Sequence, residues 1–388
     1  MINLFCRYFP PPSDGGGNVF FKNLILKFEE SINLYTHHKA INLYKKYINI
    51  FRLPFVPQQR NPSSGIRLYW STLLLFFYFL KRKAQIKKYG IHFGTLWPYG
   101  MVGLILAKLF GVKYTIFILG EELSAIVYGK GMKIKLIGFI YRMIILDATH
   151  VFAYSSFVLD NVRKLINGKL PDSINVFPTG INQDVFCNHK WVYHKNFNPK
   201  ENEKILFTVC RHIQRKGVDI LIDSVNLLNS EMKNWHLYIG GQGDYTSVLK
   251  EMVTQNNLTN KVTFLGLLKD SELHGCYRRA DIFILPNRIL DNGDADGCPI
   301  VFIEASSYGV PCIGGNVPGT YDAIVDGETG FVVDPLDTKL ISDRIALLMQ
   351  NENIRKKMGA KASKFIETNY KWRDRIDKFM EINEKISN

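Results

Sequence analysis

Short apolar runs that suit β-strands alternate with longer helical patterns along almost the whole chain, and this alternation constrains the fold most. It predicts βαβ units, and therefore parallel sheets covered by helices. The pattern passes through two cycles. The first begins with a strand expected over residues 2–9 and ends with one over 174–177, and the second runs from 205–210 to 330–333. Expected helices include residues 18–30 and one long helix over 64–89.

Two domains follow from this pattern, since 388 residues are enough for two separate cores. A polar stretch between the cycles predicts a linker over 186–203. We expect an N-terminal Rossmann-like domain over 1–185, a C-terminal one over 204–365, and a C-terminal helix over 366–388 that packs back on the first. Two doubly wound α/β domains that face a central cleft bind ligands at the carboxyl ends of their strands.

The charge is divided unevenly between the two halves. Residues 1–200 hold 26 Lys and Arg against 9 Asp and Glu, whereas residues 201–388 hold 23 against 26, so the net charges are +17 and −3. Nucleic acid and an anionic membrane surface are the two partners that suit a basic half. Because no helix-turn-helix, zinc-finger or RNA-binding signature accompanies the charge, we favour the membrane and expect no nucleic acid.

Location is indicated by the cysteines and by the apolar runs. The six cysteines are scattered without a Cys-x-x-Cys pair, which favours buried thiols in a reducing compartment. The first residues lack a signal-peptide layout. The longest apolar run, residues 73–80, is far shorter than the roughly 20 residues that span a bilayer. We therefore expect a cytoplasmic protein, peripheral on the inner face of the cytoplasmic membrane.

A basic turn follows the strand expected over 205–210. Arg211 and Lys216 are five residues apart, and Gly217 then opens a helix. Cations beside a helix N-terminus form a site for a diphosphate, because free N–H groups and the helix dipole favour anions there. The alternative is a solvated basic turn.

Two further motifs follow later strands. Residues 240–243 are glycine-rich and allow a ligand to approach the backbone, although a plain strand-to-helix turn is the alternative. Asp296 and Glu304 are eight positions apart across a turn and a helix start. Glu304 lies in an apolar segment and needs a partner, for which vicinal ribose hydroxyls, or a neighbouring Arg or Lys, would serve.

The order of these motifs resembles glycosyltransferase family 4. The resemblance begins with the glycines at 15–17, continues through the Pro-Thr-Gly-Ile-Asn stretch at 178–182, and ends with the Asp-Gly-x-x-Gly-Phe stretch at 326–331. It therefore covers nearly the whole chain. It implies a GT-B fold and transfer of a hexose, with retention of anomeric configuration, from a GDP- or UDP-hexose donor.

The resemblance also implies residue roles. Arg211 and Lys216 would hold the donor diphosphate and stabilise the leaving group, Glu304 would bind the ribose, and Asp296 would contact the sugar. The other implied donor-side residues are Gly16, Gly17, Gly241, Gly243, Gly297, Cys298, Pro299, Ile300 and Val301. The implied acceptor-side residues are Gly120, Glu121 and Asn182.

Two features depart from the family's pattern. Asp296 is one methylene shorter than the usual Glu, and Leu119 stands where relatives usually carry a His that touches the donor sugar. Asp294-x-Asp296 also reads as a metal signature of a different transferase fold, but its place in the family 4 motif disfavours a metal. We expect neither a metal nor another cofactor.

Residues 69–83 are aromatic, then apolar, then basic, an order typical of a segment that binds a phospholipid surface. A core helix with a solvated basic end is the alternative. The favoured function is therefore a peripheral, metal-independent hexosyltransferase acting on a lipid-linked or phospholipid acceptor in surface polysaccharide, lipopolysaccharide or glycolipid assembly. A soluble enzyme with a small-molecule acceptor, and a nucleotide-sugar-binding protein with weakened catalysis, are the rivals.

Overall fold

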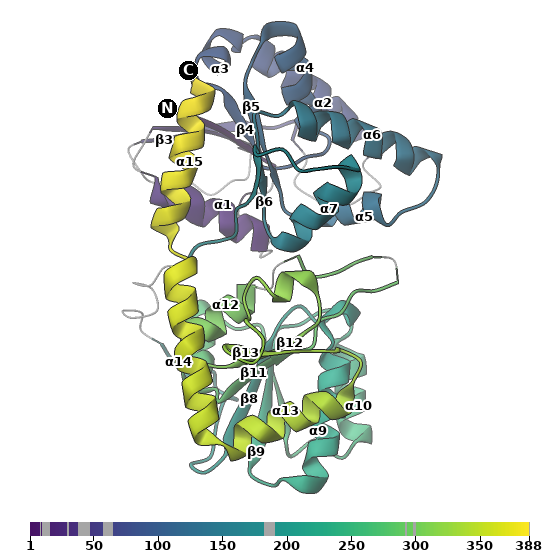
Figure 1. Cartoon of the computed structure of the whole chain (residues 1–388), viewed down its shortest axis with the longest axis vertical. Coiled ribbons are helices and arrows are strands. Elements are labelled where there is room, and N and C mark those ends of the chain that lie inside the picture. The colour runs from purple at the N-terminus through teal and green to yellow at the C-terminus, as the bar shows by residue number, and fades with distance from the viewer. Residues whose placement is uncertain are drawn as a thin grey trace. The chain divides into compact units, whose positions relative to one another are not determined.

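The computed structural model describes residues 1–7, 9, 16–28, 31–37, 47–56, 65–181, 191–291, 293–297 and 300–387. The chain divides into two compact units, of which unit 1 comprises Met1–Gly180 with Trp372–Asn388 and unit 2 comprises Ile181–Lys371. Each unit is a parallel sheet flanked by helices (Figure 1). The expected α/β class with two Rossmann-like domains is confirmed. The acceptor and donor roles expected of the two domains stay predictions.

Unit 1 is built on a seven-stranded parallel sheet in the order β3-β2-β1-β4-β5-β6-β7. Every residue of β1 and β2 is buried, as expected for strands covered on both faces. The strand order reverses between β1 and β4, where ligands of such sheets bind. The strands are β1 (Ile2–Cys6), β2 (Ile32–His37), β3 (Ile48–Leu53), β4 (Ile91–Phe93), β5 (Tyr114–Ile118), β6 (His150–Ala153) and β7 (Ile174–Val176).

The helices of unit 1 include the C-terminal one. The ring of Phe379 on α15 stacks on Phe117 and Phe152 of the sheet, with centroids 6.1 and 5.7 Å away. Asn383 Oδ1 lies 3.0 Å from His92 Nε2. These buried contacts explain why the chain's last helix belongs to unit 1. The helices are α1 (Gly16–Lys27), α2 (Gly65–Leu80), α3 (Lys83–Tyr89), α4 (Gly100–Phe110), α5 (Glu121–Val127), α6 (Met132–Asp147), α7 (Ser156–Ile166) and α15 (Trp372–Ser387).

The single helix expected over 64–89 is wrong, because α2 ends at Leu80 and α3 begins at Lys83. The last turn of α2 tightens where Arg82 N donates to the carbonyl of Phe79. The guanidinium of Arg82 lies 3.9 Å from the ring centre of Tyr78, and the new direction buries Ile86. The strands β2, β3 and β4 were not predicted.

Unit 2 has a six-stranded parallel sheet in the order β10-β9-β8-β11-β12-β13, and its order reverses between β8 and β11. Two apolar clusters fill the opposite faces of this sheet. The strands are β8 (Lys204–Val209), β9 (Trp235–Gly240), β10 (Val262–Gly266), β11 (Ile282–Leu285), β12 (Cys312–Gly315) and β13 (Gly330–Val333). The helices are η2 (Gln214–Lys216), α9 (Val218–Glu231), α10 (Thr246–Gln255), α11 (Asp270–Arg279), α12 (Ile300–Ser307), η3 (Pro318–Thr320), α13 (Thr338–Gln350) and α14 (Glu352–Asn369).

Candidate functional site

The loops that leave the carboxyl ends of neighbouring strands in unit 2 touch one another through glycines. A Cβ atom on Gly217, between η2 and α9, would lie 1.9 Å from the carbonyl oxygen of Pro286, just after β11. A Cβ atom on Gly241 would lie 1.9 Å from the carbonyl oxygen of Cys210, and Gly315 makes an equally close approach. Only glycine fits at such contacts. The loops after β8, β9, β11 and β12 therefore form one continuous edge.

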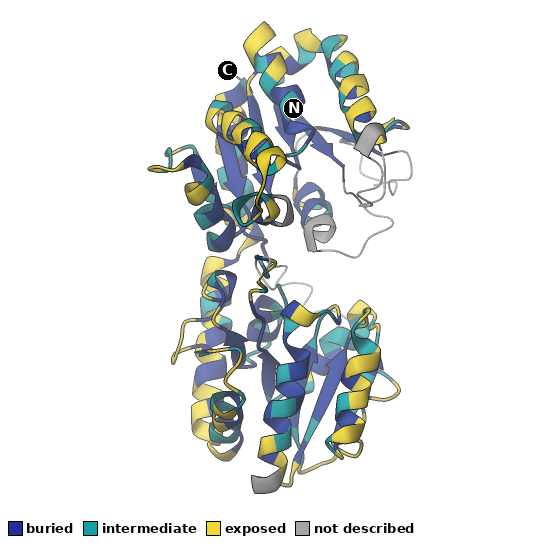
Figure 2. Ribbon diagram, turned by 90° about the vertical axis from the view of Figure 1, so that its right-hand side faces the viewer, coloured by how far each residue is buried: buried dark blue, intermediate teal, exposed yellow. Residues whose placement is uncertain are grey.

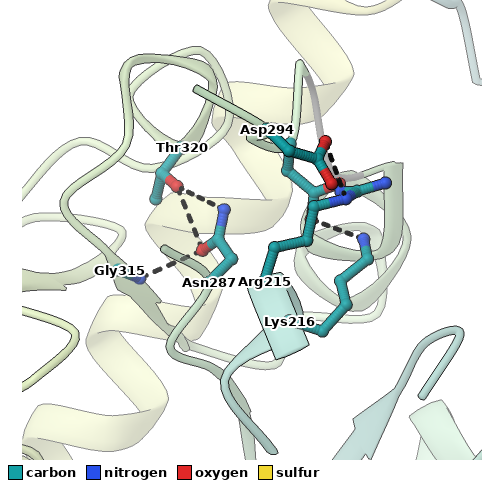
Figure 3. Close-up of polar contacts among 7 residues, drawn as sticks. Arg215, Lys216, Asn287, Asp294, Gly315 and Thr320 are labelled. Carbon is teal, nitrogen blue, oxygen red and sulfur yellow. Dashed lines mark hydrogen bonds and ion pairs between the residues drawn. The ribbon is translucent and has the colours of Figure 1, made fainter. Parts of the chain in front are cut away.

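On this edge the carboxylate of Asp296 binds two cations of the turn after β8. Nη1 of Arg215 donates to Oδ1, and Nζ of Lys216 lies 2.5 Å from Oδ2. Nε of Arg215 also lies 3.4 Å from a carboxylate oxygen of Asp294 (Figure 3). The side chains of Arg215 and Asp296 are each 9% exposed, and that of Lys216 is 13% exposed. The cluster thus joins the two strands between which the strand order reverses.

Charge explains how Asp296 stays ionised in this position. Burial by itself would raise its pKa, but the adjacent charges of Lys216 and Arg215, with their hydrogen bonds, hold the pKa below its ordinary value. Arg215, Lys216 and Asp296 together carry one net positive charge, which the more exposed carboxylate of Asp294 offsets in part. They lie directly before α9, whose first N–H groups have no partner within the helix, so the turn favours an anionic ligand.

Arg211 lies earlier in the same turn and is exposed, whereas Arg215 is buried. The sequence reasoning missed Arg215, although its signal was present as the neighbour of Lys216 in a run of basic residues. A residue of the loop after β11 holds the backbone of this turn, because Arg288 N donates to the carbonyl of Arg215 at 2.8 Å. The guanidinium of Arg288 in turn binds Asp219 at 2.6 Å. The clamp role of Arg211 and Lys216 stays a prediction.

A second polar group, also missed, stands beside this cluster. The side-chain oxygen of Asn287 accepts from the backbone N–H of Gly315 at 3.2 Å, and its amide nitrogen donates to Thr320 at 3.3 Å (Figure 3). Asn287 is fully buried and ties the exit of β11 to that of β12. A polar residue two positions after a buried strand was the available signal.

Glu304 on α12 is half-buried and accepts a hydrogen bond of 2.9 Å from the hydroxyl of Tyr277. Burial raises the pKa of Glu304, and this outweighs the opposite effect of the hydrogen bond. The partner that the structure gives Glu304 is therefore a tyrosine hydroxyl and not an Arg or a Lys. Its expected role at the ribose stays a prediction.

The remaining candidate residues are distributed over both units. Gly241 and Gly243 follow β9, Gly297 follows Asp296, and Ile300 and Val301 form the first turn of α12. Cys298, Pro299 and Asn182 lie outside the described residues. In unit 1, Gly16 and Gly17 begin α1, Gly120 precedes α5, and Glu121 is its first residue.

In the part of the chain that the structure describes, no group of three or more His, Cys, Asp and Glu side chains is placed to hold a metal ion. Both oxygens of Asp296 are engaged by cations, which does not suit the Asp294-x-Asp296 pair to a metal. Metal independence stays a prediction.

Two doubly wound units, one of which carries two largely buried cations beside a helix start at its strand-order reversal, define a GT-B type architecture. Residues 189–365 match the family described as "Glycosyl transferases group 1". The chain is 28% identical over 204 residues to the "GDP-mannose-dependent alpha-(1-6)-phosphatidylinositol monomannoside mannosyltransferase" of Mycobacterium tuberculosis, covering 52% of this chain and 53% of that protein.

Two further comparisons extend this result. The chain is 30% identical over 182 residues to the "Capsular polysaccharide biosynthesis glycosyltransferase CapM" of Staphylococcus aureus, covering 46% of this chain and 44% of that protein. The solved structure of sucrose-phosphate synthase from Thermosynechococcus elongatus superposes with a TM-score of 0.78 at 19% identity, covering 99% and 98% of the two chains, and shows the shared fold. The chain spans about half the length of the curated relatives it matches.

These findings confirm the resemblance, which the family model carries over residues 189–365. The matched segment lies wholly within unit 2 and contains the Arg215–Lys216–Asp296 cluster.

Proposed function

We propose that the protein is a retaining, metal-independent hexosyltransferase that uses a nucleotide-sugar donor. The observation that carries this proposal is the cation pair of Arg215 and Lys216 beside the start of α9, within the segment that matches the family. In a preorganised site from which water is excluded, such cations stabilise the charge that develops on a leaving nucleoside diphosphate. They do the work that a metal ion performs in other transferases.

The proposed reaction breaks the bond between the anomeric carbon of the hexose and the diphosphate oxygen. A bond from an acceptor hydroxyl forms on the same face of the sugar, and the hydroxyl proton passes to the leaving phosphate. Lys216, with Arg211 or Arg215, holds the diphosphate, Glu304 accepts from the ribose hydroxyls, and Asp296 orients the sugar. The donor is a GDP- or UDP-hexose, and the name of the mycobacterial relative favours GDP-mannose.

For the acceptor we propose a lipid-linked or phospholipid molecule, used in the assembly of surface polysaccharide or glycolipid at the cytoplasmic membrane. The names of two relatives support this choice, since one acts on a phosphatidylinositol mannoside and the other serves capsular polysaccharide biosynthesis. Among the described residues no helix is both long and apolar enough to cross a bilayer.

The test is a screen of nucleotide sugars for protection against thermal unfolding, followed by mass spectrometry of products formed with lipid extracts. One GDP- or UDP-hexose should raise the melting temperature more than its bare nucleotide does, and should be consumed when acceptor is added. Protection by nucleotide sugars together with no turnover in any extract would overturn the enzyme assignment.

Leu119 favours one rival, a nucleotide-sugar-binding protein with weakened catalysis. It lies half-buried directly after β5, where relatives usually carry a His that touches the donor sugar. Donor hydrolysis without acceptor separates the two functions. An enzyme should release nucleoside diphosphate slowly, and Leu119→His should change the rate, whereas a binding protein should release none in either form.

A further inference from the structure

Helix α6 of unit 1 exposes a continuous apolar stripe. Its exposed apolar residues recur at intervals of four and three, so they lie on one side of the helix. The exposed fraction reaches 84% at Met132 and 59% at Phe139. The opposite side, which includes Tyr141 and Ile144, is buried. The stripe consists of Met132, Leu136, Phe139, Met143 and Leu146.

Helices α2 and α4 repeat this arrangement. On α2 the side that includes Leu75 and Phe79 is buried, and α4 exposes two residues that are four positions apart. The sequence had left open whether α2 is a core helix or a surface-binding one, and the structure shows that it has both a buried and an exposed apolar side. The exposed apolar residues are Tyr69, Trp70, Leu73, Leu74 and Phe77 on α2, and Ile105 and Leu109 on α4.

The three stripes belong to one surface, because α4 packs against both α2 and α6 (Figure 1). An aromatic chain also connects the outer helices. The ring of Tyr69 lies 6.3 Å from that of Trp97, which lies 5.8 Å from that of Tyr141 on α6. Exposed positions on the helices of unit 1 are yellow in Figure 2. We call the exposed residues of α2, α4 and α6 the three-helix face.

Positive charge surrounds the three-helix face. Residues 65–147 contain 12 Lys and Arg but only 3 Asp and Glu. The exposed cations lie on the same helices and on the adjoining α3 and loops, so that apolar stripes alternate with basic positions. The exposed cations of this segment are Arg67, Lys81, Lys83, Lys87, Lys88, Lys108, Lys113, Lys130, Lys133, Lys135 and Arg142.

We propose that the three-helix face docks on an anionic lipid bilayer, a proposal that rests on the lipid acceptor proposed above and names the surface that reaches it. An apolar stripe bordered by Lys and Arg suits the boundary between acyl chains and acidic headgroups. Tyr69 and Trp70 have the amphipathic rings that concentrate at that depth. A second copy of the chain would bring like charges together, and nucleic acid would leave the apolar stripes exposed to water.

The free energy of docking would have a salt-sensitive and a salt-resistant contribution. Attraction between the cations and the headgroups decays over about 8 Å at physiological ionic strength. Burial of the apolar side chains does not depend on this screening, since it removes apolar surface from water. Both parts reside in side chains that already point to solvent, so substitutions there leave the core of unit 1 intact.

The experiment is sedimentation of the full chain with vesicles of neutral lipid or of neutral lipid with one third acidic phospholipid, at low and high salt. Leu136→Ser with Phe139→Ser should remove the binding that survives high salt. Lys133→Gln, Lys135→Gln and Arg142→Gln together should weaken binding to acidic vesicles about a hundredfold, since each cation near an anionic surface contributes a factor of about five.

Matched controls come from unit 2. Leu267→Ser with Leu336→Ser removes two leucines that are each 65% exposed, and should leave sedimentation unchanged. Brominated lipid should quench the fluorescence of the intact chain, and Trp70→Phe should lose most of this quenching while it still sediments. Equal loss of sedimentation in the control variant and in the α6 variants would overturn the proposal.

Two other results would also overturn it. One is a concentration-dependent dimer that Leu136→Ser with Phe139→Ser dissociates, because the face would then bind a second copy. The other is a chain that stays in the supernatant with acidic vesicles at low salt. Thermal protection by nucleotide sugars, measured on the same samples, separates this failure from that of the proposed function. Protection without sedimentation rejects only the docking face, and sedimentation without protection rejects only the donor site.

Discussion

The ammonium group of Lys216 lies 2.5 Å from a carboxylate oxygen of Asp296, so the cation expected to hold a diphosphate is already bound by an internal anion. A diphosphate would compete with this carboxylate for the same ammonium group. Asp296 therefore has a second role beside the sugar contact implied by the family resemblance, since it keeps two neighbouring cations together.

Replacement of Lys216 by alanine should lower turnover about 10²–10³-fold, the scale for loss of one preorganised contact to developing charge. Lys356→Ala, which removes an exposed lysine of α14 in the same unit, is the matched control and should leave turnover unchanged. Steady-state kinetics with the donor found in the screen would measure both. Equal turnover in the two variants would remove Lys216 from the site.

Replacement of Asp296 by asparagine should destabilise unit 2, because it removes the buried carboxylate that Arg215 and Lys216 share and leaves only the more exposed carboxylate of Asp294 beside Arg215. Breaking a buried pair in this way costs about 3–5 kcal/mol. A nucleoside diphosphate supplies the missing negative charge, so it should raise the melting temperature of Asp296→Asn more than that of the unaltered protein.

The same carboxylate gives a pH dependence. The pKa of Asp296 is lower in the folded protein than in the unfolded chain, so its contribution to stability is present above the unfolded pKa. It is lost as the pH falls through the lowered, folded-state value. The melting temperatures of the unaltered protein and of Asp296→Asn should therefore converge as the pH is lowered from 7. A constant difference down to the lowest pH would contradict the ion-pair explanation.

The sequence predicted the parts of the site that depend on order along the chain. Lys216, Asp296 and Glu304 were each singled out as candidates because a strand, a turn and a helix follow one another with recognisable residues between them. Their roles at the site stay predictions. The pairing of Arg215 with Asp296 could not be found in this way, because 81 positions separate them and only the strand order β8-β11 brings their loops together.

The fold, too, was predicted from the sequence only in part. The strands β2, β3 and β4 were missed because they are short and mix apolar with polar residues. The structure shows that β2 and β4 are buried throughout, whereas β3 is partly exposed and is defined by its pairing with β2. The break between α2 and α3 was missed because helical periodicity continues across Lys81 and Arg82. The direction of the chain there is set by tertiary packing of Ile86, which local sequence does not specify.

Glu304→Gln should weaken binding of bare nucleoside diphosphate without loss of stability at neutral pH. The pKa of Glu304 is raised by burial, so its contribution to stability is present below the unfolded pKa and is lost as the pH rises through the folded value. Above the raised pKa the ionised carboxylate therefore opposes folding, and a neutral amide that still accepts from Tyr277 removes this cost.

Calorimetric titration and thermal unfolding of the same samples would measure both effects of Glu304→Gln. The melting temperature should be equal or higher at pH 7, and the difference should shrink as the pH falls below the raised pKa. Tyr277→Phe is the companion variant, since it removes the hydrogen bond but keeps the charge. Unchanged nucleotide affinity in Glu304→Gln would reject the ribose role.

A chelator should leave turnover unchanged, because the proposed mechanism assigns stabilisation of the leaving group to Lys216 and its neighbouring arginine. EDTA would be added to enzyme purified without metal, followed by Mg²⁺ or Mn²⁺ in a second measurement. Loss of turnover that the divalent ion restores would mean that Asp294 and Asp296 serve a metal after all.

Replacement of Gly241 by alanine should destabilise the protein much more than replacement of Gly266. Both glycines have a positive φ, +98° and +72°, so both substitutions carry the strain of an unfavourable backbone conformation, about 1–2 kcal/mol. They differ in their surroundings. The added Cβ at Gly241 would lie 1.9 Å from the carbonyl oxygen of Cys210, whereas nothing lies within 4 Å of the one at Gly266. The pair therefore isolates the close approach between the loops after β8 and β9.

Because the backbone of Cys210 leads directly into the turn that carries Arg215 and Lys216, relief of the clash at Gly241→Ala must displace that turn. Nucleotide binding should therefore fall in Gly241→Ala even at temperatures where the variant is fully folded. Gly266→Ala should lose only stability, since its site is open and its backbone carbonyl still accepts from the N–H of residue 241. Denaturant unfolding and calorimetric titration of both variants measure the two effects. Equal nucleotide affinity in the two would show that the loop contacts support the fold but do not position the cations.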